Sequence, residues 1–193
     1  DELRSLPRLQ AEAIRTGTDR ASAWLAATEE IHEFVFLGAG PAYGVALFGA
    51  AKMLEGSGDS ACGQDLEEWA HLQYFASNVT TPTVVIDCGG AGYSRACEVA
   101  QAARAIGRRV VAVVPADERC IAGSADATFP VPGALREEFA PLLYSVPLMC
   151  LASERARLLR ETPYRGFGGG RSKVEGGGVS RVQSSALLPE VDG

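Results

Sequence analysis

Several features are scarce or missing in the 193-residue sequence, and each absence narrows the function. No apolar run reaches membrane-spanning length before charge or glycine interrupts it, which indicates a soluble protein. No basic segment precedes an apolar stretch near the N-terminus, so we expect a protein that is not secreted. The net charge is −6, and no basic block could follow a phosphate backbone, which argues against a nucleic-acid partner.

Patterns typical of disulfide frameworks and metal centres are also missing. The five cysteines form no CxxC pair and show no regular spacing, so they fit a reducing cytoplasm best. The chain has only two histidines, His32 and His71, which argues against a histidine-rich metal centre. Glu68 and His71 lie three residues apart, but one such pair provides too few ligands. We therefore expect no metal and no cofactor.

The sequence does contain short apolar runs that alternate with amphipathic stretches. Three strands are predicted, over residues 34–37, 83–88 and 109–114. The first two are followed by glycine turns and by helices over 43–55 and 94–106, the second helix capped by Gly107. This alternation predicts an α/β fold with a mostly parallel sheet that helices cover on both faces.

Weaker patterns complete the outline. They predict short strands within 57–64 and at 129–131, and a helix over 65–76. Helical stripes over 3–14 and 21–28 predict two helices before the first strand. A long helical pattern begins at Glu137, and Pro147 inside it predicts a kink or a division. We divide the chain into lead-in helices over 1–30, a domain over 31–160 and a glycine- and serine-rich tail over 161–193.

Two glycine turns stand where ligands of parallel α/β sheets bind, beyond the carboxyl ends of the strands. The first is Gly38-Ala-Gly40 and the second is Gly89-Gly-Ala-Gly92. A helix N-terminus after such a turn can hold an anion, although the turn can also serve only to reverse the chain. A dinucleotide site would need a third glycine where Tyr43 stands. It would also need an acidic residue at the end of the second strand, and we can place none there. Both missing features disfavour a nucleotide-binding oxidoreductase.

Three polar side chains could carry chemistry. Lys52 follows Phe48 by four residues and Glu55 follows it by seven. This spacing places all three side chains on one face of a helix. Such a pair is commonly a solvated surface contact, so it does not identify a site by itself. His71 belongs to the residue type best suited to proton transfer at neutral pH, although a histidine beside Trp69 also fits a structural role.

Three ordered segments resemble the sugar isomerase (SIS) domain family. Residues 37–55, LGAGPAYGVALFGAAKMLE, are similar to the family stretch LGRGxxYPxALEGALKLKE. Residues 67–71, EEWAH, resemble its EEWxH or ELKHGP segment, and residues 139–148, FAPLLYSVPL, resemble IAPIxYTVPLQ. The opening LRSLP resembles the linker between two SIS domains. The similarity spans about residues 1–160 and is greatest to the second SIS domain of the isomerase half of glucosamine-6-phosphate synthase.

The resemblance implies a three-layer α/β/α sandwich with a flavodoxin-like sheet. It also implies a phosphosugar isomerase, or an enzyme that forms or deglycates amino sugars, acting on a ketose or aldose 6-phosphate by an enediol-type proton transfer. In the family, the residue matching Glu55 moves the proton between C1 and C2, the one matching His71 opens the ring, and the one matching Lys52 lies near the developing charge. Lys173 is the nearest counterpart of a catalytic lysine in the family's tail. The expected substrate-binding residues are Gly38, Gly40, Tyr43, Gly90, Gly92 and Ser94.

The chain also departs from the family pattern. Phe48 replaces a glutamate, and Leu72-Gln73 replaces Gly-Pro after the histidine. The glycine turns lack the serines and threonines of phosphate-binding loops, so we expect another SIS domain, upstream or in a partner, to hold the sugar phosphate. We expect the chain to form a homodimer or to pair with another SIS domain. The resemblance allows the histidine to be donated across a dimer interface. The alternative is a noncatalytic phosphosugar-binding, regulatory or dimerisation module.

Overall fold

The structure is a computed structural model that describes residues 2–28, 30–76 and 80–161. Within these residues five parallel strands form one sheet in the order β2-β1-β3-β4-β5. The strands are β1 (Glu33–Gly38), β2 (Ser60–Asp65), β3 (Thr83–Ile86), β4 (Val110–Pro115) and β5 (Ala127–Val131). The helices are α1 (Glu2–Leu25), α2 (Pro41–Gly56), α3 (Leu66–His71), α4 (Tyr93–Ala105) and α5 (Pro141–Leu158), with short 3-10 turns η1 (Gln73–Phe75) and η2 (Ala122–Ser124). The predicted flavodoxin-like α/β sandwich is confirmed.

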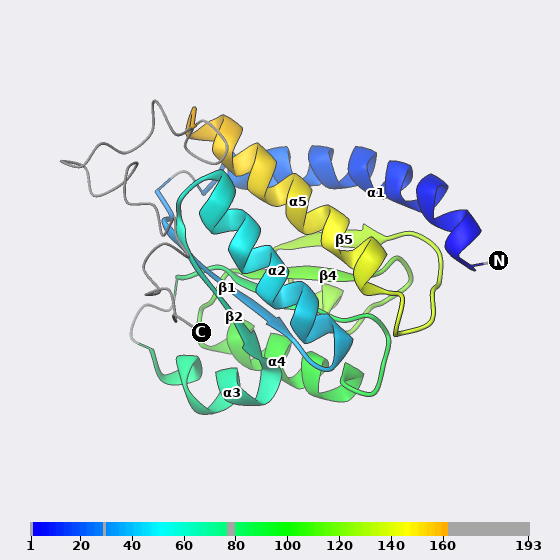
Figure 1. Cartoon of the computed structure of the whole chain (residues 1–193). Helices are drawn as coiled ribbons and strands as arrows, with labels where there is room; N and C mark the ends of the chain where they lie inside the picture. The colour runs from blue at the N-terminus through cyan, green and yellow to red at the C-terminus, as the bar shows by residue number, and fades with distance from the viewer. Residues whose placement is uncertain (1, 29, 77–79, 162–193) are drawn as a thin grey trace, which may run out of the picture.

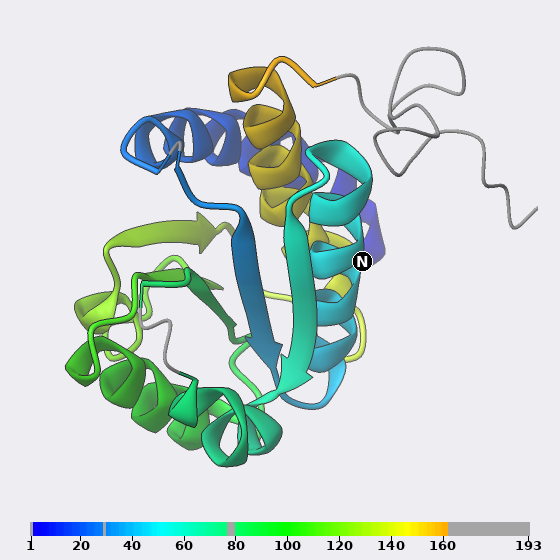
Figure 2. The same cartoon turned by 90° about the vertical axis from the view of Figure 1, so that its left-hand side faces the viewer.

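Helices cover both faces of the sheet (Figures 1 and 2). Helices α1, α2 and α5 lie on one face, and α3 and α4 lie on the other. Because side chains alternate along a strand, Phe34 and Phe36 of β1 enter the first core while Val35 and Leu37 enter the second. The strands β3 and β4 are buried along nearly their whole length, as parallel strands between two helical layers are.

The edge strand β2 shows how closely the first helical layer packs. Its residues are only partly buried, and α2 crosses it at Gly63. A Cβ atom at Gly63 would lie 2.7 Å from the Cα atom of Leu47. No larger residue fits there without a shift of the α2 backbone, so Gly63 fixes the position of α2 on the sheet.

Two predicted strands and one capping residue are confirmed in detail. The short strands expected within 57–64 and at 129–131 are parts of β2 and β5. Gly107 follows α4 with a φ of 93°, the left-handed conformation typical of a residue just past a helix end. None of the described helices combines the length and apolar character needed to cross a membrane.

The helix boundaries correct two predictions and exclude one of the two alternatives of a third. The two lead-in helices are one helix, α1, because every fourth residue from Leu9 to Leu25 faces the core and forms a continuous stripe against α5. The helix predicted over 65–76 ends at His71, since Leu72 has φ −121° and ψ −79° and the chain restarts as η1. Pro147 does not divide α5, which runs through it with buried side chains on both sides. Packing of α5 against α1 and α2 holds both halves of this helix.

Candidate active site

A pocket of about 230 Å³ lies between α2 and α5. Lys52, Glu55 and Gly56 line it from α2, and Met149 and Ser153 line it from α5 together with two alanines. The helices approach closely at its floor, because a Cβ atom at Gly56 would lie 3.2 Å from the carbonyl oxygen of Ala152. We call this the α2–α5 pocket.

The structure brings two of the predicted catalytic residues together in this pocket. The Nζ atom of Lys52 donates to Oε2 of Glu55 at 2.5 Å, and the side chains are 28% and 42% exposed. The same ammonium lies 5.2 Å from the centre of the Phe48 ring, as expected for three residues on one helix face. A carboxylate that can accept a proton thus stands beside a cation that can balance negative charge on a bound molecule.

The α2–α5 pocket lies at the amino ends of the strands. Helix α2 begins after the carboxyl end of β1 at Pro41 and runs back along the sheet (Figure 1). Tyr43 and Glu55 are twelve residues apart on this helix, which corresponds to about 18 Å along its axis. The predicted catalytic pair therefore lies at the amino ends of the strands, and the predicted glycine-turn residues lie at the carboxyl ends.

A buried ionic network joins the ends of the two helices that line the pocket. Arg155 and Asp59 are fully buried, and Nε of Arg155 donates to Oδ2 of Asp59 at 2.8 Å. Arg155 also donates to the carbonyl oxygens of Thr28, at 3.1 Å, and Ile31. Asp59 accepts further hydrogen bonds from Ser57 Oγ at 2.7 Å and from the ring of His32 at 2.9 Å.

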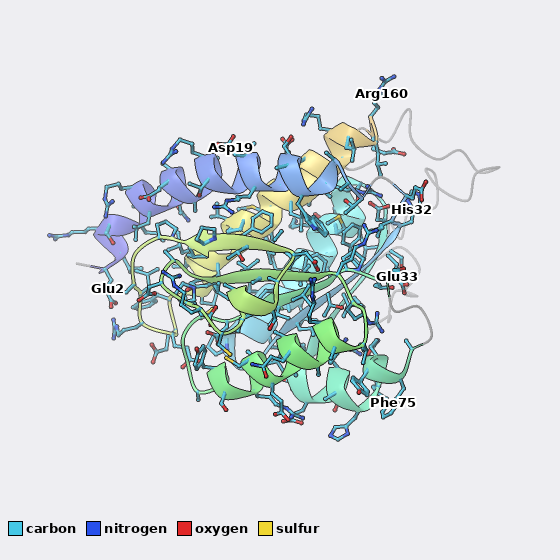
Figure 3. All side chains as sticks on the ribbon, turned by 180° about the vertical axis from the view of Figure 1, so that it is seen from behind. Glu2, Asp19, His32, Glu33, Phe75 and Arg160 are labelled. Atoms are coloured by element: carbon cyan, nitrogen blue, oxygen red, sulfur yellow. The ribbon has the colours of Figure 1, made fainter. Side chains whose placement is uncertain are left out.

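Two residues of this network belong to the helices that line the pocket. Ser57 ends α2 two residues after Glu55, and Arg155 stands between the two α5 alanines that line the pocket. Burial opposes ionisation of Asp59, but the hydrogen bonds from Arg155, Ser57 and His32 outweigh it and hold the pKa of Asp59 below its usual value. His32 lies at the surface near the start of β1 (Figure 3). Sequence reasoning missed this network, because nothing in the pattern shows that a polar loop residue meets an arginine 96 positions later.

His71 lies away from the other candidate catalytic residues. It ends α3, on the face of the sheet opposite α2 and α5, and its side chain is 75% exposed. Its Nε2 atom is 3.8 Å from Oε2 of Glu67. Close by, Leu72 and Phe75 are also exposed, and Phe75 projects outward from the end of this layer (Figure 3). The structure does not bring His71 and Glu55 together within one chain.

The two glycine turns meet at the carboxyl edge, where β1 and β3 are neighbours and their helices leave to opposite faces. Gly38 has no room for a side chain, since its Cβ atom would lie 2.3 Å from the carbonyl oxygen of Ala42. Gly40 has a φ of 54° and is the residue immediately before the start of α2. Tyr43 and Ser94, in the first turns of α2 and α4, are exposed.

A carboxylate that sequence reasoning missed lies between these turns. Glu137, from the loop between β5 and α5, lies so close to Gly90 that a Cβ atom there would be 2.1 Å from its Oε1. A Cβ atom at Gly40 would be 3.6 Å from the same oxygen, and one at Gly92 would meet Ala39 at 2.9 Å. The absence of side chains at both turns thus creates the space that Glu137 fills. Only its position just before the 139–148 segment could have drawn attention to it.

The carboxyl edge is acidic as well as tightly packed. Burial raises the pKa of Asp87, and nearby Glu118 and Glu137 raise it further against the opposing hydrogen bond from the Gly89 N–H. Burial, Asp87 and Glu137 together raise the pKa of the Cys88 thiol to about 12. Negative charge at this edge disfavours a second anion. The substrate-binding role of the glycine-turn residues stays a prediction, and Lys173 lies outside the described residues.

Comparison with known proteins identifies the relatives of this chain. No protein-family model matches it. Among curated proteins, the glutamine–fructose-6-phosphate aminotransferase (isomerizing) of Gloeobacter violaceus is 34% identical over 151 residues, and that of Thermosynechococcus vestitus is 31% identical over 150. Each alignment covers 78% of this chain and 24% of the relative. The chain thus spans about a quarter of the length of these enzymes.

Solved structures support the same relationship at the level of the fold. The C-terminal domain of glucosamine-fructose-6-phosphate aminotransferase from Francisella tularensis superimposes with a TM-score of 0.72 at 20% identity, over 82% of this chain and 45% of that one. The NanR protein of Vibrio vulnificus, solved in complex with ManNAc-6P, gives a TM-score of 0.59 at 14% identity, over 82% of this chain and 62% of that one.

Proposed function

Since the chain is a SIS domain that matches the isomerase part of glutamine–fructose-6-phosphate aminotransferases, we propose that it supplies half of a phosphosugar-isomerising active site. The observation that carries this proposal is the Lys52–Glu55 pair in the α2–α5 pocket. The substrate class is a ketose or aldose 6-phosphate, and the reaction is a proton transfer between C1 and C2 through an enediol.

Glu55 is the base in this proposal. Its carboxylate removes a proton from one carbon of the open-chain sugar and returns it to the neighbouring carbon, so that no net proton is gained or lost. Lys52 stabilises the negative charge that develops on the sugar oxygen while the proton is in transit. The buried Arg155–Asp59 network holds the helix ends that carry these groups, which keeps the pair positioned.

The second half of the site comes from another SIS domain. His71 and Glu55 occupy opposite faces of the sheet, so we propose that the histidine that opens the sugar ring reaches Glu55 from a second copy of the chain in a homodimer. The carboxyl edge around Glu137 is acidic in every copy of this chain, so we propose that a separate SIS domain, with a different sequence, holds the phosphate group. We also propose a cytoplasmic location for the assembled protein.

Isotope exchange with fructose 6-phosphate in heavy water tests the catalytic proposal. We expect deuterium to enter at the carbon-bound position that Glu55 deprotonates, as observed by NMR. Glu55→Gln should slow this exchange by about 10²-fold to 10⁴-fold, because it removes the base. Glu98→Gln, an exposed change on α4, is the matched control and should leave the rate within about twofold. Equal exchange in Glu55→Gln and wild type would contradict the role of Glu55.

One observation favours a second function, a noncatalytic phosphosugar-binding module. Phe48 stands where the resembling family has a glutamate, and its ring packs near the Lys52 ammonium in place of another carboxylate. The ligand-bound structural neighbour shows that this fold also occurs with a phosphosugar bound to a protein whose name is not that of an isomerase. Sugar binding without any exchange, with equal affinity in wild type and Glu55→Gln, is the result that would support this alternative.

A further inference from the structure

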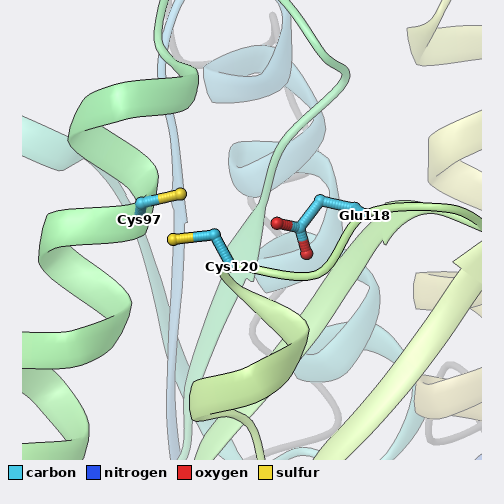
Figure 4. Close-up of side chains that lie close together, drawn as sticks. All are labelled: Cys97, Glu118 and Cys120. Atoms are coloured by element: carbon cyan, nitrogen blue, oxygen red, sulfur yellow. The ribbon is translucent and has the colours of Figure 1, made fainter.

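Two cysteines far apart in the sequence lie together on the α3/α4 face of the sheet. Cys97 is buried in the second turn of α4, and Cys120 is half-buried between β4 and η2. Their sulfur atoms and a carboxylate oxygen of Glu118 lie within 4.8 Å of one another. Figure 4 shows the two sulfur atoms pointing toward each other, one from the helix and one from the loop.

Glu118 holds the loop that carries Cys120. Its Oε1 atom accepts from the N–H of Ile121 at 2.8 Å and from the hydroxyl of Tyr93 at 3.3 Å, and its Oε2 atom accepts from the N–H of Ala122 at 2.9 Å. These bonds satisfy two backbone N–H groups at the start of η2 and tie the loop to the start of α4. Both carboxylate oxygens therefore have structural partners, while the two thiols remain facing each other.

The cysteines differ in their access to an external reagent. Burial raises the pKa of the Cys97 thiol to about 11, with further contributions from Cys120 and Glu118, which makes Cys97 a poor first nucleophile. Cys120 is more exposed and accepts a hydrogen bond from Nε2 of Gln101 at 3.6 Å. A reagent from solution thus meets Cys120 first, and Cys97 is in place to react with the product.

We propose that Cys97 and Cys120 are a redox modification site that forms an intramolecular disulfide with a low-molecular-weight disulfide such as glutathione disulfide. The Cys120 thiol gives up its proton and bonds to one glutathione sulfur, and the other glutathione leaves as a thiol. Cys97 then gives up its proton and attacks the Cys120 sulfur, and the second glutathione leaves. The protein loses two electrons and two protons, and one glutathione disulfide becomes two glutathione molecules.

The disulfide would join α4 to the loop that follows β4 and close a ring over positions 97–120. A cross-link over a ring of this size restricts the unfolded chain. For a domain of this length, we expect oxidation to raise Tm by about 5–10 °C. The site lies on the face opposite the α2–α5 pocket, so this inference does not depend on the proposed catalytic function.

Peptide mapping tests the proposal directly. The reduced chain is incubated with glutathione disulfide, its remaining thiols are alkylated, and it is digested with trypsin. Cys97 and Cys120 fall in separate tryptic peptides, Ala96–Arg104 and Cys120–Arg136, each with a single cysteine. We expect the mass of these two peptides joined by a disulfide, at a yield independent of protein concentration.

Variants make the test specific. Cys97→Ser and Cys120→Ser should each lose the linked peptide and the rise in Tm on oxidation, whereas Cys62→Ser, a half-buried cysteine on β2, should keep both. A stable glutathione adduct on Cys120 with no linked peptide would overturn the proposal. So would a link from Cys120 to any other cysteine, because the pairing would then not be set by the folded structure.

Discussion

Replacing Arg155 with methionine should strongly destabilise the protein. The variant keeps much of the volume of the side chain but leaves the buried Asp59 carboxylate without its guanidinium, which is 2.8 Å away in the native chain. Removing one partner of a buried ion pair typically costs about 3–5 kcal/mol. Ser57 and His32 still donate to Asp59, so we expect the lower half of that range. For a chain of this size, the loss corresponds to a Tm decrease of about 6–15 °C.

Urea unfolding followed by circular dichroism measures this change, and Arg157→Met on the same helix is the matched control. Arg157 pairs with Glu154 at 2.6 Å, but its side chain is 66% exposed, so its loss should cost at most about 1 kcal/mol. A double variant in which Asp59 is also replaced by leucine should recover part of the loss, because no unpaired charge remains. Equal destabilisation by Arg155→Met and Arg157→Met would refute the argument that burial makes the Arg155 pair important.

The same network predicts a pH dependence with a definite sign. The folded pKa of Asp59 lies below its ordinary value of 3.8, so ionised Asp59 stabilises the fold above that pH. This contribution is lost as the pH falls through the lower, folded-state pKa. The stability difference between wild type and Asp59→Asn should therefore be constant at neutral pH and shrink below about pH 4.

Two further predictions concern packing and the acidic edge. Gly63→Ala should destabilise the chain by about 1–3 kcal/mol, since the new Cβ atom would lie 2.7 Å from Leu47 Cα, whereas Gly44→Ala on the open side of α2 should stabilise it by up to about 1 kcal/mol. Chemical denaturation of both variants checks this, and destabilisation by both would contradict the packing argument. Glu137→Gln should lower the pKa of the Cys88 thiol, which Glu137 helps to raise, and so speed its alkylation by iodoacetamide at a fixed pH. An unchanged rate of Cys88 alkylation would show that Glu137 does not raise the pKa of this thiol.

The fold could be predicted from the sequence because its signals are local. The buried runs of β1, β3 and β4 are continuous, and the glycine turns mark where each of the first two ends. Helix boundaries were less predictable, because tertiary contacts decide them. Leu9 to Leu25 form one helix since α5 offers a continuous surface to pack on, and Pro147 is accommodated because its neighbours are buried on both sides.

The candidate site was predictable only in part, for a similar reason. Lys52 and Glu55 lie three residues apart on one helix, so the spacing alone places them together. The contacts of Arg155 with Asp59 and of Glu137 with Gly90 join residues separated by 96 and 47 positions, and no periodicity encodes them. The same is true of the Cys97–Cys120 pair, which exists only because η2 packs on α4.

Subunit complementation can show whether this chain supplies half of an active site. Glu55→Gln and His71→Ala each remove one half, so each homodimer should lack sugar isomerisation or exchange. When the two variants are unfolded together and refolded as a mixture, half of the dimers are mixed and one of their two sites is intact. If the site is shared between two copies, the mixture should recover about a quarter of wild-type activity. Activity in the mixture no higher than in the separate variants would contradict a site shared between two copies of the chain.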